Sequence, residues 1–262
     1  MVWTSAVKIA YNGRDFNGSQ RQPDVRTVEG EVLRSLKKVQ AIETADSSRF
    51  RTASRTDRGV SALGNVVCFD TDFRPDRLLQ ALNAVAEGVY FHAVAEVPHD
   101  FSPRRAKQRW YRYHLDARNV DVERFSACAD LFLGRHDFKR FCKHEGRSTL
   151  KTIDSVQIVP VGDIVVVDLK AREFLRNMVR RMVAAMEAVG KGEAELGQVE
   201  QALQGRDTSF GLADPGGLVL MDIAYEVAFT TSVPETMARR IRKERQDALL
   251  NLLFYDSLKD MQ

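Results

Sequence analysis

The residues of this 262-residue chain best suited to chemistry lie at positions 53–72, ASRTDRGVSALGNVVCFDTD. Asp57 lies in a glycine-containing turn between Arg55 and Arg58, directly before an apolar run that predicts a buried strand. If this segment is extended, the side chains of Arg55 and Asp57 emerge on the same face and can form an ion pair. A neighbouring guanidinium keeps a carboxylate ionised, which suits a nucleophile and opposes a general acid.

Two other interpretations of this segment stay open. One is a solvated surface charge in an ordinary loop, which is the common fate of an aspartate. The other is a metal site, because Asp70 and Asp72 resemble the Asp-x-Asp of magnesium-dependent phosphotransferases. No later pair of acids completes such a site, so we expect a single carboxylate that works without metal or cofactor.

Positive charge is concentrated in one segment, although the formal net charge of the chain is only +3. The segment FSPRRAKQRWYRYHL, residues 101–115, contains five cations and no acid. Its aromatic residues Trp110, Tyr111 and Tyr113 lie among these cations, and cations combined with aromatic rings suit single-stranded nucleic acid. A strand with one solvated basic face is an equal alternative. The five cations are Arg104, Arg105, Lys107, Arg109 and Arg112.

Composition bounds the class of protein. A chain of 262 residues with 44% hydrophobic content can bury the core of one large domain or of two ordinary ones. No stretch approaches the roughly 20 apolar residues of a membrane span, and the N-terminus lacks a signal-peptide pattern, so we expect a cytoplasmic protein. The three cysteines, Cys68, Cys128 and Cys142, indicate neither a disulfide framework nor a zinc site.

Hydrophobic periodicity predicts alternating strands and helices in both halves of the chain. We therefore expect an α+β fold with two mixed subdomains, residues 1–103 with the Asp57 loop and residues 104–262 with Tyr111 and a C-terminal helix. Their largely antiparallel sheets are expected to join around a basic cleft. The predicted strands are 5–11, 62–70, 88–97, 109–115, 153–161, 163–171 and 217–227, and the predicted helices are 28–39, 75–85, 122–132, 173–190, 196–203 and 234–258.

Six motifs occur along residues 5–226 in the order found in TruA-type pseudouridine synthases, and the chain resembles that family. The strongest is SRTDRGVSA, which is similar to the family signature Arg-Thr-Asp-x-Gly-Val. The resemblance implies a pseudouridine synthase fold and an isomerase that needs no cofactor and no metal. The other motifs are YNGRDFNGSQRQ with TVEGEVLRSL, FSPRRAKQRWYRYHL, HDFKRFC, EFLRNMVRRMV and DPGGLVLMDIAY.

The resemblance assigns roles to individual residues. In this family an aspartate attacks the target uridine, the glycosidic bond breaks, and the uracil is reattached through carbon; Asp57 matches that aspartate. Arg55 matches the arginine that pairs with it, and Tyr111 matches the tyrosine that stacks on the uracil. Leu218 matches the apolar residue beneath the base, and Arg180 lies on a helix near the active-site cleft.

The resemblance also implies partners. It implies a tRNA substrate modified in the anticodon arm, and a homodimer. Arg58, Arg104, Arg105 and Gln20 are the expected additional RNA contacts. A non-catalytic RNA-binding module of the same fold is the alternative function.

Departures from the usual pattern indicate the archaeal or eukaryotic branch of the family. Arg58 stands where alanine or lysine is usual, and Asn177 in the helix motif points to the same branch. Ser61 stands where bacterial relatives carry histidine. Ser19 stands where many relatives carry an aromatic residue, so we do not expect base stacking at that loop.

Overall fold

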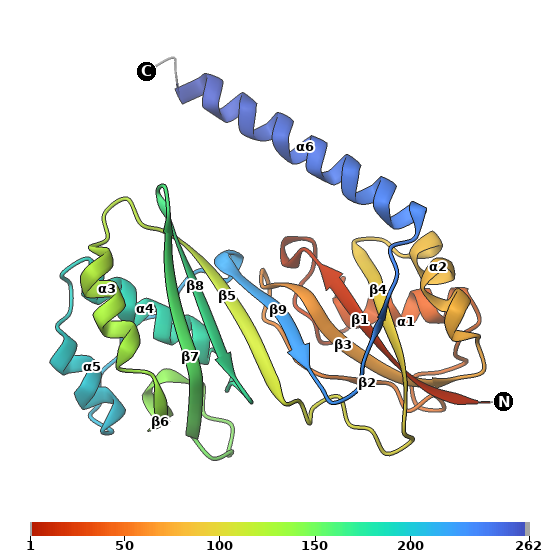
Figure 1. Ribbon diagram of the computed structural model, residues 1–262, viewed down its shortest axis with the longest axis horizontal. Helices are drawn as coiled ribbons and strands as arrows, with labels where there is room; N and C mark the ends of the chain where they lie inside the picture. The colour runs from red at the N-terminus through yellow and green to blue at the C-terminus, as the bar shows by residue number, and fades with distance from the viewer. Residues whose placement is uncertain (1, 260–262) are drawn as a thin grey trace.

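The strands form one continuous sheet in the computed structural model, which describes residues 2–259 (Figure 1). Its order is β10-β4-β1-β3-β9-β5-β8-β7-β6, with β2 added beside β3. Every strand pair among the described residues is antiparallel except β3 and β9. The strands are β1 (Trp3–Tyr11), β2 (Arg51–Thr52), β3 (Ser61–Thr71), β4 (Val89–Val97), β5 (Gln108–Asp116), β6 (Gly134–Asp137), β7 (Leu150–Val161), β8 (Ile164–Ala171), β9 (Leu218–Ala224) and β10 (Thr230–Thr231).

The predicted mixed α+β fold with a largely antiparallel sheet is confirmed. Strand β9 joins the two halves because it lies between β3 and β5. The division at residue 103, however, does not separate two bodies. Strand β10 pairs with β4, so the chain returns to the first half after β9, and the C-terminal helix lies with that half and not with the second.

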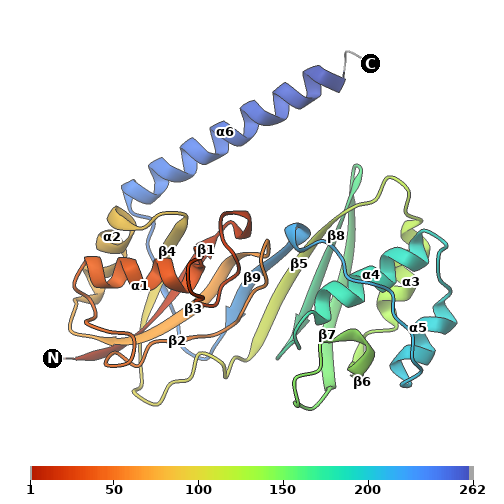
Figure 2. The same cartoon turned by 180° about the vertical axis from the view of Figure 1, so that it is seen from behind.

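Local capping signals fix where the first helices begin. The Thr27 hydroxyl accepts a hydrogen bond from the Gly30 amide (3.2 Å), and Pro75 occupies the first turn of α2, as predicted. Helices α1 and α4 lie on the same side of the sheet, behind it in Figure 1 and in front of it in Figure 2. The helices are α1 (Val28–Lys38), α2 (Pro75–Val85), α3 (Val122–Asp130), α4 (Met178–Gly190), α5 (Leu196–Leu203) and α6 (Glu235–Lys259), with short 3-10 turns at Gly13–Asp15, Lys139–Phe141 and Pro215–Gly217.

Helix α4 begins five residues later than its apolar pattern predicts. Asn177 has a φ of 62° and precedes the helix, which begins at Met178. Asparagine is among the few residues that adopt this left-handed conformation readily, and the conformation interrupts a helix. Phe174 is therefore outside the helix, and its ring packs edge-on against Tyr111 at 5.1 Å between centroids.

The two faces of β5 have different surroundings. Tyr111, Tyr113 and Leu115 are buried on one face, as the alternation predicts. On the other face, Trp110 and Arg112 both donate to the buried carboxylate of Asp168, at 2.6 and 2.8 Å. The cations and aromatic rings of residues 109–113 thus do not form one interleaved RNA surface, because one face of the strand is buried and the side chains on the other face are engaged by Asp168.

Helix α6 projects from the body, and only its first turns contact it (Figure 1). Met237 is buried, and the Arg240 guanidinium lies over the Tyr90 ring at 4.5 Å. Among residues 248–258 the large apolar side chains are all exposed. Within residues 2–259, no helix has the length and apolar character needed to cross a membrane.

Candidate active site

Asp57 lies in the loop between β2 and β3, with 33% of its side chain exposed. The loop is held by its neighbour Thr56. The Thr56 amide donates to the Ser19 hydroxyl (2.7 Å), and the Thr56 carbonyl accepts from the Ser19 amide (3.0 Å). The Thr56 hydroxyl also meets the Tyr11 hydroxyl at 2.9 Å. Ser19, whose position cast doubt on stacking, is thus a buried anchor for the Asp57 loop.

Glycine is needed where the first loop of the chain meets the turn after Asp57. A Cβ atom at Gly13 would lie 2.2 Å from the Val60 carbonyl oxygen. The Gly13 amide also donates to the Ser61 hydroxyl at 3.0 Å. This close approach fixes the position from which Asp57 is presented.

The guanidinium that contacts Asp57 comes from Arg180. Its Nη1 atom lies 3.2 Å from Asp57 Oδ2, and its Nε atom donates to the Ala213 carbonyl at 2.8 Å. The expected ion pair of Arg55 with Asp57 is wrong: no such pair occurs within residues 2–259, and Arg55 is exposed. Strand β2 ends at Thr52, so no strand pairing imposes the extended alternation on which that expectation depended.

Tyr111 lies deep in the same region. It is 8% exposed, on β5 opposite Leu220 of β9 and Leu169 of β8. Burial raises the pKa of Tyr111, and the negative charge of Asp57 raises it further, while Arg109 and the Ser54 side chain act in the opposite direction. The phenol is therefore neutral at neutral pH and lies within electrostatic range of Asp57.

Leu218 is the buried first residue of β9 and pairs with Tyr113 of β5. The residue after it, Val219, pairs with Ser61 at the start of β3, so this end of β9 lies beside the strand that Asp57 precedes. Gly217 allows the approach, because a Cβ atom there would lie 2.7 Å from the His114 carbonyl oxygen.

Sequence reasoning missed the role of Arg109. This buried side chain donates from Nε to the Ser54 hydroxyl (3.1 Å), from Nη1 to the Arg172 carbonyl (2.6 Å) and from Nη2 to the Arg104 carbonyl (3.0 Å). It therefore ties β5 to the segment before Asp57. Its place in a basic segment suggested RNA contact, and no sequence signal distinguishes a buried arginine there.

The residues expected to contact RNA divide into two groups by whether they line a cavity. Arg58 and Arg105 are exposed and are not in the lining of the cavity described next. Gln20, Arg55 and Arg104 share a cavity of about 370 Å³ beside the Asp57 loop. We call this cavity the basic pocket, and its lining includes Gln20, Glu29, Phe50, Arg51, Arg55 and Arg104.

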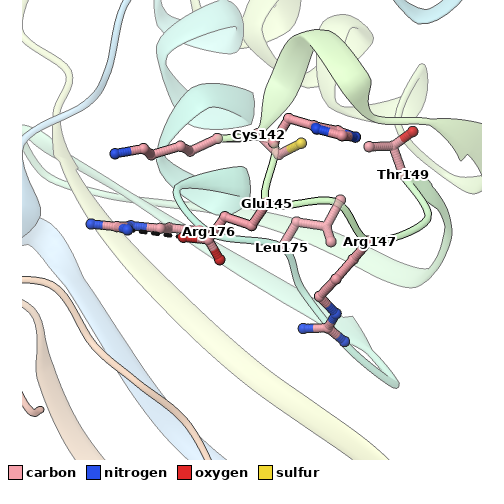
Figure 3. Close-up of a pocket in the computed structure, with 8 residues that line it drawn as sticks. Cys142, Glu145, Arg147, Thr149, Leu175 and Arg176 are labelled. Carbon is pink, nitrogen blue, oxygen red and sulfur yellow. Dashed lines mark hydrogen bonds and ion pairs between the residues drawn. The ribbon is translucent and has the colours of Figure 1, made fainter.

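A second cavity lies between the loop 142–149 and the segment before α4 (Figure 3). It measures about 10 Å³, room for about one water molecule. Arg176 pairs there with Glu145 at 2.9 Å. The hydrogen bond that Arg176 donates to Glu145 raises the pKa of Arg176, and the charge of Asp57 adds to this effect, so Arg176 is a further cation in the surroundings of Asp57.

The contacts of Asp70 are structural. Its carboxylate accepts hydrogen bonds from the Thr4 hydroxyl (2.7 Å) and from Arg49 Nη2 (2.8 Å), and these partners lower its pKa against the opposing effect of burial. Asp72 is exposed. Within the described residues no group of three or more His, Cys, Asp or Glu side chains is placed to hold a metal ion. The contacts of Asp70 account for its position without the phosphotransferase interpretation.

Comparison with known proteins defines the class as a pseudouridine synthase. A family model described as tRNA pseudouridine synthase matches residues 128–226. The chain is 43% identical over 225 residues to tRNA pseudouridine synthase A of Pyrococcus abyssi, covering 84% of both chains. It is 37% identical over 265 residues to that of Pyrococcus furiosus, covering 98% of both.

The chain belongs to the tRNA pseudouridine synthase A family and is an isomerase. A relative with this description from Methanosarcina mazei is 38% identical over 226 residues and covers 84% of both chains. Among solved structures, a chain titled "Crystal Structure of a Cbf5-Nop10-Gar1 Complex" matches with a TM-score of 0.36 and 11% identity, over 70% of this chain and 45% of that chain.

Proposed function

We propose that this enzyme converts uridine to pseudouridine in the anticodon arm of tRNA, with Asp57 as the nucleophile. The observation that carries the proposal is the Asp57 carboxylate, held 3.2 Å from the Arg180 guanidinium on a loop with fixed neighbours. An ionised carboxylate with one oxygen engaged keeps lone pairs free to attack carbon.

The reaction balances without any added atom. The Asp57 carboxylate forms a bond to the uridine, at C1′ of the sugar or at C6 of the base, and the N1–C1′ bond breaks. The uracil turns while still held, and a C5–C1′ bond forms. In the C1′ route this bond displaces the carboxylate from C1′, whereas in the C6 route the carboxylate leaves C6 as the C5 proton is lost and the C5=C6 double bond is restored. In both routes the C5 proton is lost and N1 gains a proton, so the product is an isomer of the substrate.

The neighbouring residues have distinct roles in this proposal. The target base leaves its stack to reach the half-buried carboxylate. Tyr111 and Leu218 provide the apolar surface against which the uracil lies, since both are buried on the paired strands β5 and β9. Arg180 orients the carboxylate. Arg55 and Arg58, both exposed beside it, contact the flipped nucleotide and its phosphate.

The test compares wild type and Asp57→Asn on an unmodified tRNA transcript in EDTA, with pseudouridine mapped by chemical labelling. We expect wild type to modify uridines of the anticodon arm, and Asp57→Asn to lose turnover by on the order of 10³-fold or more while tRNA affinity stays within a few fold. Asp72→Asn is the matched control, because it removes an exposed carboxylate elsewhere.

Three results would contradict the proposal. Substantial turnover by Asp57→Asn would remove the nucleophile assignment. Loss of wild-type turnover in EDTA would favour a metal-dependent reaction. Tight tRNA binding without any base change would favour the alternative function, a non-catalytic RNA-binding module.

We also propose that the enzyme is a homodimer. The supporting observation is the leucine-rich end of α6, residues 248–258, in which seven large apolar side chains are exposed: Leu249, Leu250, Leu252, Leu253, Phe254, Tyr255 and Leu258. Monomeric proteins rarely expose so much contiguous apolar surface, so this end of the helix requires a partner.

A further inference from the structure

The basic pocket is large enough for a nucleotide and is distinct from the contacts of Asp57. Its volume of about 370 Å³ lies within the range of about 300 to 1,000 Å³ that small-molecule sites have. The pocket in Figure 3, about 10 Å³, is too small for any part of an RNA chain. Size alone therefore directs a second nucleotide to the basic pocket.

The charge of the lining favours an anion. Arg51, Arg55 and Arg104 contribute three guanidinium groups, and none of them forms an ion pair within residues 2–259. Glu29 is the one acid in the lining, and its carboxylate accepts the Arg21 amide at 2.9 Å. Arginine forks bind phosphate oxygens in pairs, so the lining suits a phosphate group.

Arg51 supplies a second, independent observation. Its Nε atom is buried and has no hydrogen-bond acceptor within the described chain. Its Nη2 atom meets only the Cys68 sulfur, at 3.8 Å. A buried donor without an acceptor is rare in folded proteins and calls for a ligand or a water molecule.

The rest of the lining suits a base. Phe50 is partly exposed in the pocket and offers an aromatic surface on which any base can stack. Gln20 brings an amide that can donate to and accept from a base edge.

The pocket is preformed, because each segment of its lining is held by the fold. Arg51 pairs with Cys68 in the β2–β3 ladder. The Arg104 carbonyl accepts from the buried Arg109 side chain at 3.0 Å. Gln20 follows Ser19, whose hydroxyl holds Thr56, so the pocket and Asp57 share one anchored loop.

We propose that the basic pocket binds one nucleotide adjacent to the target uridine in the same RNA strand. Its phosphate contacts the three arginines and its base stacks on Phe50. The inference rests on the proposed function, since it names the part of the substrate that holds the strand while the target base is at Asp57. A fixed neighbour gives the flipped nucleotide a defined position.

The first experiment is a double-mutant cycle between protein and RNA, read as binding affinity in the Asp57→Asn background so that it does not depend on turnover. Two anticodon stem-loop RNAs are compared with the intact one. The first has an abasic position directly before the target uridine, and the second has an abasic position directly after it. We expect one of the two positions to weaken binding by about 5- to 100-fold. In Phe50→Leu the same abasic position should have little further effect. Additive losses, or no loss at either position, would overturn the proposal.

The second experiment removes charge. Arg51→Gln and Arg104→Gln should each weaken binding of the intact stem-loop and reduce the salt dependence of the affinity. Arg77→Gln, an exposed cation on α2, is the control and should change neither. Thermal unfolding shows that each variant is folded. Unchanged affinity and salt dependence in both variants would refute the pocket, whereas absence of pseudouridine formation by wild type would refute the proposed function alone.

Discussion

The side chain of Arg180 determines how Asp57 is presented to a substrate. It donates to Asp57 and to the Ala213 carbonyl, so it joins the Asp57 loop to the segment before β9. With 11% of its side chain exposed, it is also partly shielded from water. Charge-assisted hydrogen bonds of this kind are about twice as strong as neutral ones, so Arg180 fixes the position of the carboxylate.

Arg180→Lys tests this control. Lysine keeps the positive charge but lacks the planar fork, so it cannot reach Asp57 and the Ala213 carbonyl together. We expect kcat to fall by about 10- to 100-fold, the worth of one charged hydrogen bond, with tRNA affinity little changed. Single-turnover rates and equilibrium binding measure the two effects. A lysine variant with wild-type kcat would show that the charge alone suffices, and Arg77→Lys controls for a remote substitution.

Tyr111→Phe separates stacking from proton transfer. Burial raises the pKa of Tyr111, so its oxygen is a neutral phenol and a weak base at neutral pH. We expect Tyr111→Phe to keep turnover within about 10-fold, because the ring remains, and Tyr111→Leu to lose more. Multiple-turnover assays from pH 6 to 9 provide the measurement. A loss of about 10² or more in Tyr111→Phe would instead assign proton transfer to the hydroxyl.

Individual residues differed in how far the sequence predicted their surroundings. The motif around Asp57 located the loop, because consecutive residues share one local structure. The partner of Asp57 was predicted wrongly, since Arg180 is 123 positions away and local spacing carries no information about such a contact. Arg109 was missed for the same reason: its acceptors come from three separate segments.

Strand β9 is the element on which the site most depends. It separates β3 from β5, and it brings Leu218 between the strand that follows Asp57 and the strand that carries Tyr111. The turn before it packs on the Asp57 turn, since a Cβ at Gly59 would lie 3.1 Å from Pro215. The alternation of apolar residues predicted a strand there, but alternation identifies the two faces of a strand and not its neighbours.

Gly217→Ala tests the approach of β9 to β5. The new Cβ would lie 2.7 Å from the His114 carbonyl oxygen and 2.8 Å from the Tyr113 ring, so backbone has to move. We expect a loss of roughly 1–3 kcal/mol in the free energy of unfolding, together with reduced turnover. Denaturant unfolding measures the stability. Gly197→Ala in α5, where a Cβ meets nothing within 4 Å, is the matched control and should be neutral or stabilising. Equal stability of the two variants would contradict the argument.

At the scale of the whole molecule, the return of the chain to its first half is the feature that the sequence did not reveal. Strand β10 contains only Thr230 and Thr231, which is too short for a periodic signal. The helices with strong apolar faces were predicted to within a few residues at most ends, because burial of one face specifies them. Where α6 lies is set by contacts of Met237 and Arg240, which local pattern does not encode.

The proposed attraction of the molecule to RNA is assigned to the exposed cations of residues 101–107. Lys107 pairs with Glu226 at 3.1 Å, and Arg112 further along pairs with Asp168, whereas Arg104 and Arg105 are exposed.

The double variant Arg104→Gln/Arg105→Gln should bind tRNA more weakly and with a shallower salt dependence. If each arginine contacts one phosphate, the slope of log affinity against log salt falls in magnitude by about 1.4 to 1.8. Filter binding at four or more salt concentrations gives this slope. Arg74→Gln/Arg77→Gln, which removes two exposed charges at the N-cap and in the first turn of α2, should leave it unaltered. A wild-type slope in the first variant would show that residues 104 and 105 do not contact phosphates.

The leucine-rich end of α6 carries the prediction about assembly. Residues 235–247 keep their own anchors on the body, the buried Met237 and the contact of Arg240 with Tyr90, so a chain that ends at residue 247 should fold normally. We expect light scattering to show a dimer for the full chain and a monomer for this truncated chain, because the exposed apolar side chains that need a partner are gone. The substitution pair Leu250→Glu/Phe254→Glu should have the same effect without shortening the helix.

Since Asp57, Arg180 and Tyr111 lie in one chain, turnover per site should stay within a few fold in the monomer. A truncated chain that remains dimeric would place the interface elsewhere, and a full-length chain that is monomeric at micromolar concentration would refute the homodimer.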